Sequence, residues 1–120
     1  MPIDYSGLAL PKPTPRVVDR IAVKRDLAQQ ERTCRRHVRR REDGRCRACG
    51  RRPQHMHHLE RRSRGGKWRP ENVVHTCVAC HQFAHAALLH FAGNPEPGHR
   101  FTVTSTGAAA DHLRRGPAGR

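Results

Sequence analysis

The sequence predicts a small α+β domain held together by a metal ion, and three observations lead to this fold class. The chain has 120 residues, of which 35% are apolar, and it contains only three Phe, one Trp and one Tyr. So short and polar a chain buries too little apolar surface to be stable without an additional staple. Two Cys-x-x-Cys pairs, Cys46/Cys49 and Cys77/Cys80, offer that staple. Short strand-like segments lie between the pairs, and helical patterns lie on either side of them.

The balance of charge predicts a polyanionic partner. Lys and Arg number 24 against 10 Asp and Glu, which gives a formal net charge of +14. Nucleic acid is the favoured partner, and a ribosomal-type or merely solvated basic protein is the alternative. A membrane partner is disfavoured, because no long amphipathic face combines basic residues with leucines and aromatics. The chain shows no apolar run of about 18 residues and no secretory signal pattern, so we expect a cytoplasmic protein.

The N-terminal part of the chain is expected to contain an arm and a helix. Residues 1–16 hold four prolines and no periodic apolar pattern, which predicts an extended or disordered arm. Residues 17–43 are expected to form a basic helix, since no Gly or Pro interrupts them and apolar residues recur at helical spacing. Arg39 and Arg40 lie in a basic run near its end. We interpret them as phosphate contacts, and a solvated basic face is an equally weighted alternative.

The central segment, residues 44–106, is expected to be the folded core. Its predicted elements are a strand at 54–59, a polar loop at 60–69, a strand at 73–76, a helix from 78 to about 91, a turn at 93–98 and a strand at 101–105. The helix would supply these core residues: Val78, Phe83, Ala86, Ala87 and Phe91. Trp68 is expected to anchor the loop rather than stack on nucleic acid. Residues 107–120 are expected to be a disordered basic tail.

The four paired cysteines predict a structural zinc site. Two residues between the cysteines of a pair let both thiolates reach one metal ion. A redox pair is the alternative for one such motif, but the βαβ pattern expected around it is absent from the sequence. Five cysteines, four of them paired in this way, also suit a reducing compartment better than disulfides do. The fifth, Cys34, is expected to be a small, partly buried helix residue.

A second group of side chains is left over for chemistry. His57 and His58 end the first predicted strand, while His81 and His85 lie four residues apart and so share one helix face. Asn72 lies between them in the sequence. A neutral His can deprotonate water near pH 7, and a divalent cation can act as a Lewis acid on a phosphate. Adjacent strand residues face opposite sides, so both histidines can serve one phosphate only if the strand ends or twists there.

Most of the other histidines are expected to have no specific role. A single His on a helix is more often a surface residue than a ligand, and only the recurrence of several in one order raises the odds of function. The histidines set aside on this ground are His37, His55, His75, His90, His99 and His112. His55 is the one that neighbours the pair and is a candidate spare contact.

Residues 45 to 92 resemble the HNH endonuclease family. The matching motifs are Cys46-x-x-Cys49, His57-His58-Leu59, Arg62-Ser63-Arg64-Gly65-Gly66, Glu71-Asn72-Val73-Val74, Cys77-x-x-Cys80-His81 and His85. The chain looks most like the small phage-type members with a four-cysteine zinc site. The resemblance implies a ββα-metal core, also called a His-Me finger, that presents a divalent ion to a DNA phosphate. An association with phage DNA-packaging machinery is a further possibility that it implies.

The resemblance also implies a role for each residue of the site. His58 would be the general base, and Asn72 would orient it through the loop backbone or, as in some branches, reach the metal. The metal ligands would be His57 and His81, with His85 as a possible third. The expected phosphate-binding residues of the loop are Arg62, Arg64 and Lys67. Many members with the four-cysteine site carry Asp at the position of His57. Asp suits Mg²⁺, whereas His shifts preference toward Zn²⁺, Ni²⁺ or Mn²⁺, so all four ions remain candidates.

Three functions compete on this evidence. The favoured one is a metal-dependent endonuclease that nicks or cuts DNA, preferably double-stranded. The second is a non-catalytic zinc-knuckle module that binds nucleic acid and would need the cysteines and basic residues but not His58, Asn72 or His81. The third is an accessory phage protein in which a nuclease fold serves as an interaction surface. The retention of the His and Asn set favours the first.

Overall fold

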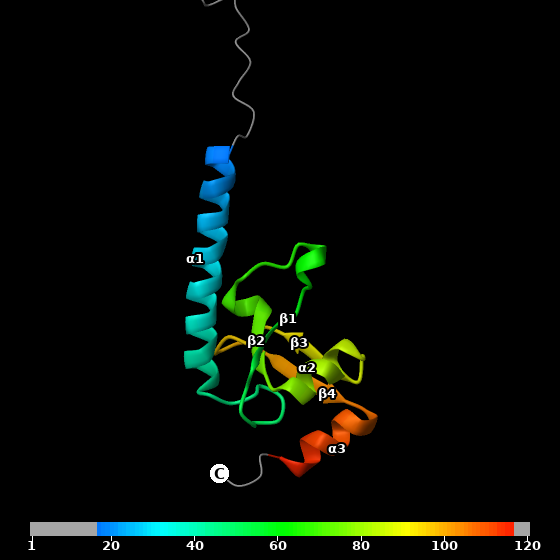
Figure 1. Ribbon diagram of the computed structural model, residues 1–120. Coiled ribbons are helices and arrows are strands. Elements are labelled where there is room, and N and C mark those ends of the chain that lie inside the picture. The colour runs from blue at the N-terminus through cyan, green and yellow to red at the C-terminus, as the bar shows by residue number, and fades with distance from the viewer. Residues whose placement is uncertain (1–16, 117–120) are drawn as a thin grey trace, which may run out of the picture.

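The computed structural model describes residues 17–116, so the predicted arm at 1–16 and the end of the predicted tail at 117–120 lie outside the described residues. The elements, in chain order, are α1 (Val17–Glu42), β1 (His55–His58), the short 3₁₀ helices η1 (Arg62–Arg64) and η2 (Pro70–Asn72), β2 (Val73–Thr76), α2 (Val78–His85), β3 (Leu89–Gly93), β4 (Phe101–Ser105) and α3 (Gly107–Arg115). Figure 1 shows two small sheets with helices around them, which confirms the predicted α+β class.

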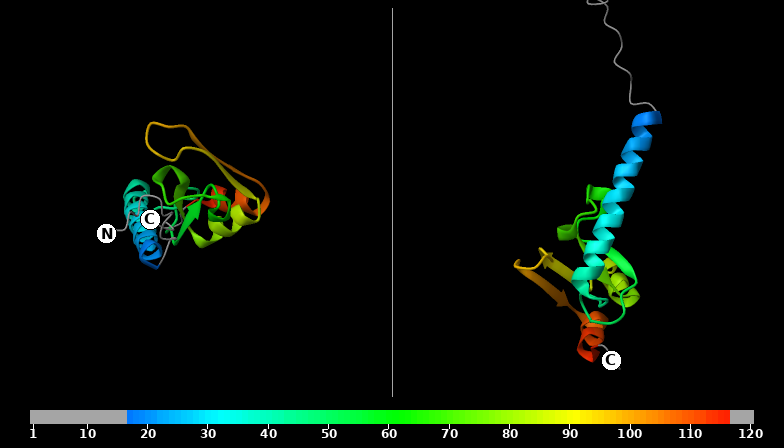
Figure 2. Two further views of the ribbon diagram at one scale, coloured as in Figure 1. Left: turned by 90° about the horizontal axis from the view of Figure 1, so that it is seen from above. Right: turned by 90° about the vertical axis from the view of Figure 1, so that its left-hand side faces the viewer.

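Helix α1 follows the prediction closely, but only its C-terminal half packs against the rest of the protein. Cys34 and Val38 are buried there against Val73 of β2. The N-terminal half projects beyond the core (Figures 1 and 2). Ile21 and Leu27, which belong to the predicted apolar stripe, are therefore 45% and 48% exposed. Cys34 is fully buried rather than partly buried.

The end of α1 is fixed to the core by buried charges. Arg41 donates hydrogen bonds to the carbonyl oxygens of Pro70 and Val73 and pairs with Glu42. Glu96, in the loop between β3 and β4, lies 2.8 Å from the His37 ring and 3.6 Å from the Arg41 guanidinium. That loop reaches across to α1 in the view from above (Figure 2). Arg41 therefore has a structural role, in contrast to its exposed neighbours.

The strands β1 and β2 form an antiparallel hairpin and confirm the two predicted strands. In its register, His57 lies opposite Val74 and His58 lies opposite Val73. The connection between the strands was expected to be an irregular loop. It instead contains the two short 3₁₀ helices, with Gly65 in the left-handed conformation at the end of the first. This compact connection leads the chain from the end of β1 back to β2.

The prediction of one helix from Val78 to about Phe91 is wrong. The helix ends at His85, and Ala87 takes a positive φ of 60°. Residues Leu89–Gly93 form β3, which pairs with β4 in an antiparallel hairpin. Leu89 is 2% exposed and packs in the cluster that contains the paired cysteines. Tertiary burial of Leu89 thus prevails over the helical propensity of the local sequence.

The predicted core of that helix is correspondingly wrong in part. Val78, Ala86 and Ala87 are exposed, whereas Phe83 and Phe91 pack against the buried cysteine cluster. Val78 is the first residue of α2, which begins at the cysteine pair and turns this position toward solvent.

The prediction of a disordered tail from residue 107 is also wrong for the described part. Residues Gly107–Arg115 form α3. Ala109 is fully buried and Leu113 packs beside it against the cysteine cluster. The Ala-rich sequence has high helix propensity, and this contact supplies the packing that a short helix needs. Among the described residues, no helix has the length and apolar character needed to cross a bilayer.

Candidate zinc site and active site

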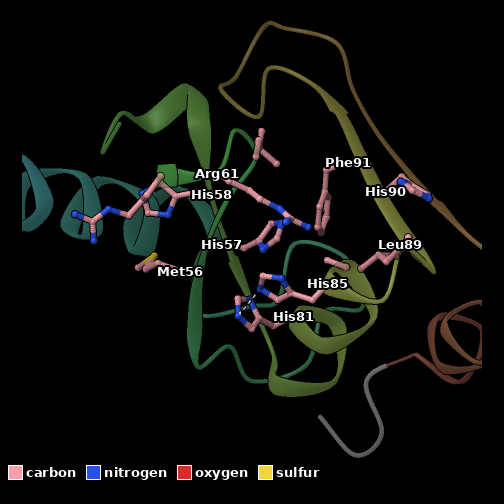
Figure 3. Close-up of a pocket in the computed structure, with 13 residues that line it drawn as sticks. Met56, His57, His58, Arg61, His81, His85, Leu89, His90 and Phe91 are labelled. Atoms are coloured by element: carbon pink, nitrogen blue, oxygen red, sulfur yellow. Dashed lines mark hydrogen bonds between the residues drawn. The ribbon is translucent and has the colours of Figure 1, made fainter. Parts of the chain in front are cut away.

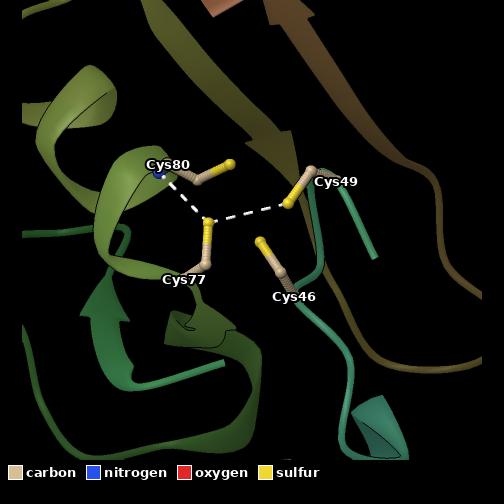
Figure 4. A group of neighbouring side chains, drawn as sticks. All are labelled: Cys46, Cys49, Cys77 and Cys80. Atoms are coloured by element: carbon tan, nitrogen blue, oxygen red, sulfur yellow. Dashed lines mark hydrogen bonds between the residues drawn. The ribbon is translucent and has the colours of Figure 1, made fainter. Parts of the chain in front are cut away.

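Two distant segments bring four cysteines together. Cys46 and Cys49 lie in the turn after α1, and Cys77 and Cys80 lie at the start of α2 (Figure 4). All four are buried, with exposed fractions between 0% and 7%. Their sulfur atoms lie within 4.8 Å of one another, and the sulfurs of Cys49 and Cys77 are 3.6 Å apart. A tetrahedral Zn²⁺ ion with four thiolates has sulfur–sulfur separations of about 3.8 Å, so the residues fit this ion.

The electrostatics of this cluster also call for a cation. A hydrogen bond with Cys80 lowers the pKa of the Cys46 thiol to about 4 and raises the pKa of Cys80. Burial raises the pKa of Cys49 to about 11. Four adjacent buried thiols therefore cannot all ionise unless a positive charge compensates them. A metal ion requires the thiolate form and supplies that charge.

Two polar groups lie beside the sulfur of Cys77 in the cluster. The backbone N–H of Cys80 donates to the sulfur of Cys77 at 3.4 Å, as expected for a zinc-knuckle turn. The ring of His112 lies on the other side, with its Nε2 atom 3.8 Å from the same sulfur. His112 belongs to α3 and was one of the histidines expected to have no role. The position of His112 beside the cysteines depends on α3, which was not predicted. No local sequence pattern therefore indicates this contact.

A second cluster consists of three histidines. His57 comes from β1, whereas His81 and His85 stand one turn apart on α2 (Figure 3). Their nearest ring nitrogens all lie within 4.8 Å of one another, and the Nε2 atoms of His81 and His85 are 3.1 Å apart. The ring centroids of His57 and His81 are 5.4 Å apart. Three imidazoles on one side of an ion leave its remaining coordination positions open, which is typical of catalytic metal sites.

The surroundings keep the imidazoles of His57 and His81 in the neutral form that binds metal. Burial lowers the pKa of His57 to about 4, and the neighbouring rings of His81 and His85 act in the same direction. Burial also lowers the pKa of His81. Only a neutral imidazole can coordinate a metal ion, so neither ring needs to lose a proton near pH 7.

The three-histidine cluster lines a pocket of about 490 Å³. Arg61 and Arg62, from the connection after β1, contribute positive charge to its wall. Phe91 of β3 closes another side, with its ring centroid 5.6 Å from that of His57 (Figure 3). His55 stacks on His81 at 4.7 Å with an interplanar angle of 14°. Sequence reasoning placed Phe91 in a helix and treated His55 as a spare contact at most.

His58 lines the same pocket but faces away from the three histidines. β1 ends at His58, and the ring of His58 points to the other side of the hairpin from that of His57, toward α1 (Figure 3). Its ring packs against the Trp68 ring, with centroids 4.4 Å apart and planes at 79°. The Nε2 atom is buried and has no hydrogen-bond partner among the described residues. Burial lowers the pKa of this ring, and the nearby Arg62 and Arg35 act in the same direction.

Asn72 holds the backbone that follows His58. Its side-chain Oδ1 accepts a hydrogen bond from the Glu60 N–H at 2.7 Å. Its Nδ2 donates to the carbonyl oxygens of Glu60 at 3.2 Å and Lys67 at 3.0 Å. The backbone carbonyl of Asn72 accepts from the Leu59 N–H at 2.8 Å. Asn72 therefore ties the two ends of the connection together and does not belong to the three-histidine cluster.

The basic residues singled out from the sequence are at the surface. Arg62, Arg64 and Lys67 are exposed on the connection between the strands, and Arg39 and Arg40 are exposed on α1. The Arg62 guanidinium also lies over the Trp68 ring, 5.9 Å from its centroid.

Comparison with known proteins identifies the family of the central segment. A family model described as HNH endonuclease matches residues 32–87. No curated protein and no solved structure gives a significant match. The matched segment contains both cysteine pairs, the three clustered histidines, His58 and Asn72. It ends before β3 and α3, which complete the pocket wall and cover the cysteine cluster. Residues 32–87 of this chain therefore match an HNH endonuclease domain.

Proposed function

We propose that the protein is a metal-dependent endonuclease that hydrolyses phosphodiester bonds of DNA. The observation that carries this proposal is the cluster of His57, His81 and His85 in an open pocket that His58 also lines. An ion on three imidazoles keeps coordination positions free for a phosphate oxygen and a water molecule. The match of residues 32–87 to an HNH endonuclease domain supports the same chemistry.

The three histidines would hold a divalent ion, and a bound ion would supply Lewis acidity to the scissile phosphate. His58 would accept the proton of the attacking water as general base. Its lowered pKa keeps the ring neutral near pH 7, so it is ready to accept a proton. Because Nε2 is buried, the base would act through Nδ1.

Asn72 would act by holding the connection in place. The side-chain amide of Asn72 forms hydrogen bonds with both the N–H and the carbonyl of Glu60, two residues beyond His58. This fixes the direction in which the chain leaves β1. We therefore assign Asn72 an orienting role rather than a place among the metal ligands.

The four cysteines would hold a structural Zn²⁺ ion. The ligands are buried and all four coordination positions are used, so the site has no room for a substrate. The same ion would connect the end of α1 to the start of α2.

Duplex DNA is the proposed substrate, and exposed cations would contact its phosphates. The residues proposed for these contacts are Arg62 in the pocket wall, Arg64 and Lys67 elsewhere on the connection between the strands, and Arg39 and Arg40 on α1. The formal net charge of +14 favours association with any polyanion. Phosphate contacts alone carry no base information, so we expect little sequence preference.

Plasmid cleavage tests the proposal. Zinc-loaded wild type and His58→Ala are compared in EDTA and then with added Mg²⁺, Mn²⁺, Ni²⁺ or Zn²⁺. We expect nicking that needs an added ion and is lost in the variant. If no ion supports cleavage while zinc and DNA are still bound, the protein is a non-catalytic nucleic-acid-binding module. Cleavage only with added packaging proteins would indicate an accessory role.

A further inference from the structure

The ring of His58 lacks the hydrogen bond that usually orients a catalytic imidazole. In such sites, the second ring nitrogen commonly donates to a carboxylate or a backbone carbonyl, which fixes the ring. Here Nε2 is buried, yet no described residue offers it a partner. Another contact therefore has to keep the ring from rotating about its side-chain bonds.

Trp68 makes that contact. The ring centroids of His58 and Trp68 are 4.4 Å apart, and the planes meet at 79°. Edge-to-face packing of this kind is directional, so it restricts the orientation of the smaller ring. The indole itself is half-buried and packs against the cluster of Cys34, Val38 and Val73. It is therefore a rigid surface rather than a mobile side chain.

Cations from two elements hold the indole in place. The Arg35 guanidinium of α1 lies 4.7 Å from the ring centroid, and the Arg62 guanidinium lies 5.9 Å from it. Arg35 is in turn held by Glu31, with Nη2 and Oε1 2.9 Å apart. The backbone just before the indole is also fixed, because the Lys67 carbonyl accepts a hydrogen bond from Asn72. Trp68 thus meets α1, the connection and β1 at one point.

We propose that Trp68 is a positioning residue for His58: its ring takes the place of the missing hydrogen bond and holds the imidazole with its free nitrogen toward the pocket. The proposal rests on the proposed function in one respect, which is that His58 serves as the general base. It assigns to Trp68 more than the anchoring of a loop. It also differs from stacking of the indole on a nucleic-acid base, which would act on substrate binding.

Ring-retaining and ring-removing substitutions separate these roles. Trp68→Phe keeps an aromatic ring, whereas Trp68→Leu keeps apolar bulk without one. Zinc content and thermal melting are measured first for both. In plasmid nicking, we expect Trp68→Leu to lower kcat by about 10-fold to 100-fold with little change in KM, because a misplaced base loses rate. Trp68→Phe should recover most of that loss. Equal kcat for wild type and Trp68→Leu would overturn the proposal, as would a raised KM with unchanged kcat, which indicates base stacking.

A milder pair of variants keeps the test decisive if Trp68→Leu fails to fold. Arg35→Gln removes the cation over the indole, and Arg36→Gln removes the same charge from the next, exposed position. Each of the two variants loses one positive charge, so their electrostatic attraction to DNA should weaken equally. We expect kcat to fall in Arg35→Gln alone. A parallel change in the two variants would show that the cation over Trp68 has no positioning effect and would contradict the proposal.

NMR tests the contact without any activity. The chain has a single Trp. Any effect of an indole ring current on the chemical shifts of the His58 ring protons therefore comes from Trp68. We expect these shifts to move in Trp68→Leu, while those of the exposed His99 stay unchanged. Unchanged His58 shifts would overturn the proposal. If His58→Ala cleaves like wild type, the role of His58 as general base fails, and the NMR result still decides whether Trp68 holds the ring.

Discussion

The protein contains two clusters of metal-binding side chains that differ in how they meet solvent. The four cysteines are all buried and can fill a tetrahedral coordination shell. The three histidines line a pocket of about 490 Å³ and leave coordination positions free. Closed four-ligand sites stabilise folds, whereas sites with a free position bind and activate substrates. Under the proposed function, the cysteine cluster would serve stability and the histidine cluster chemistry, as their exposure and ligand count suggest.

The two clusters are also mechanically linked, because one helix supplies side chains to both. Cys77 and Cys80 begin α2, and His81 and His85 follow on the same helix. The N–H of His81 donates to the carbonyl of Cys77 at 2.9 Å. Loss of the zinc site should therefore disturb the histidines, whereas loss of a histidine should leave the zinc site intact.

Replacement of one zinc ligand should unfold the domain. In Cys77→Ser, we expect loss of bound zinc and of the cooperative thermal transition, because zinc binding in small domains contributes on the order of 10 kcal/mol. That is comparable to the whole stability of a domain. Circular dichroism and metal analysis measure the effect. Cys34→Ser, a buried cysteine outside the cluster, is the control and should keep its zinc. An unchanged melt for Cys77→Ser would show that zinc does not hold the fold.

Removal of the proposed base should abolish cleavage without affecting the fold. We expect His58→Ala to lower kcat by about 10²-fold to 10⁴-fold, the usual contribution of general base catalysis. Zinc content, melting temperature and DNA affinity should remain at wild-type values. The exposed His99→Ala is the matched control. Wild-type cleavage by the His58 variant would remove this residue from the mechanism.

Exchange of one ligand in the open cluster should change which ion supports cleavage. His57→Asp replaces a nitrogen ligand by a hard oxygen ligand, which suits Mg²⁺. We expect the ratio of nicking rates with Mg²⁺ and Ni²⁺ to rise by at least about tenfold, while one zinc per chain is retained. The same ratio for His99→Asn should not rise, because His99 is exposed and lies outside the pocket lining. An unaltered ion preference would place the catalytic ion elsewhere.

Neutralisation of a surface cation on the connection between β1 and β2 should weaken DNA binding by a smaller, salt-dependent amount. For Lys67→Gln, the slope of log K against log salt should become shallower by about 0.9, the value for one phosphate contact on duplex DNA. Fluorescence anisotropy with a short duplex at several salt concentrations measures the slope. Arg114→Gln, an exposed cation on α3, serves as the comparison. Equal slopes for wild type and Lys67→Gln would exclude Lys67 from the interface.

The smallest effect concerns the cysteine that belongs to neither cluster. Burial raises the pKa of Cys34 from 9.0 to about 11, so the reactive thiolate is scarce below that pH. At pH 8, alkylation should be about 100-fold slower than for an ordinary thiol and should speed up as the pH rises toward 11. Peptide mapping after iodoacetamide treatment of the zinc-loaded protein measures the rate. Fast alkylation of Cys34 at pH 8 would mean that α1 separates from the core.

The sequence predicted the parts of the fold and site that depend on short spacing. Both cysteine pairs are brought together as expected, and the alternating segments around His58 and Val74 form the paired strands. A spacing of two residues between paired cysteines, or a step of four between histidines on a helix, fixes the relative positions of the side chains within about one turn of the chain. Such local rules require no knowledge of the tertiary fold.

The parts that were missed depend on long-range packing. The segment from Ala86 to Phe91 has helical propensity, but burial of Leu89 beside the cysteines makes it turn and pair with β4. The composition after residue 106 predicted disorder, yet Ala109 is fully buried against the same cluster. The contact between His58 and Trp68 crosses two elements whose relative placement no local pattern encodes. Each miss is a case in which tertiary contacts decide the outcome.

If the two clusters hold two ions with separate functions, a chelator should remove the two ions in separate steps with separate consequences. The zinc-loaded protein is dialysed against a mild chelator, and zinc content, thermal melting and plasmid nicking are followed on the same samples before and after divalent ions are restored. We predict that a folded form with one zinc per chain and no nicking accumulates first, and that an added ion restores nicking. Nicking by the one-zinc form without an added ion, or loss of nicking only when the fold is lost, would contradict this separation of functions.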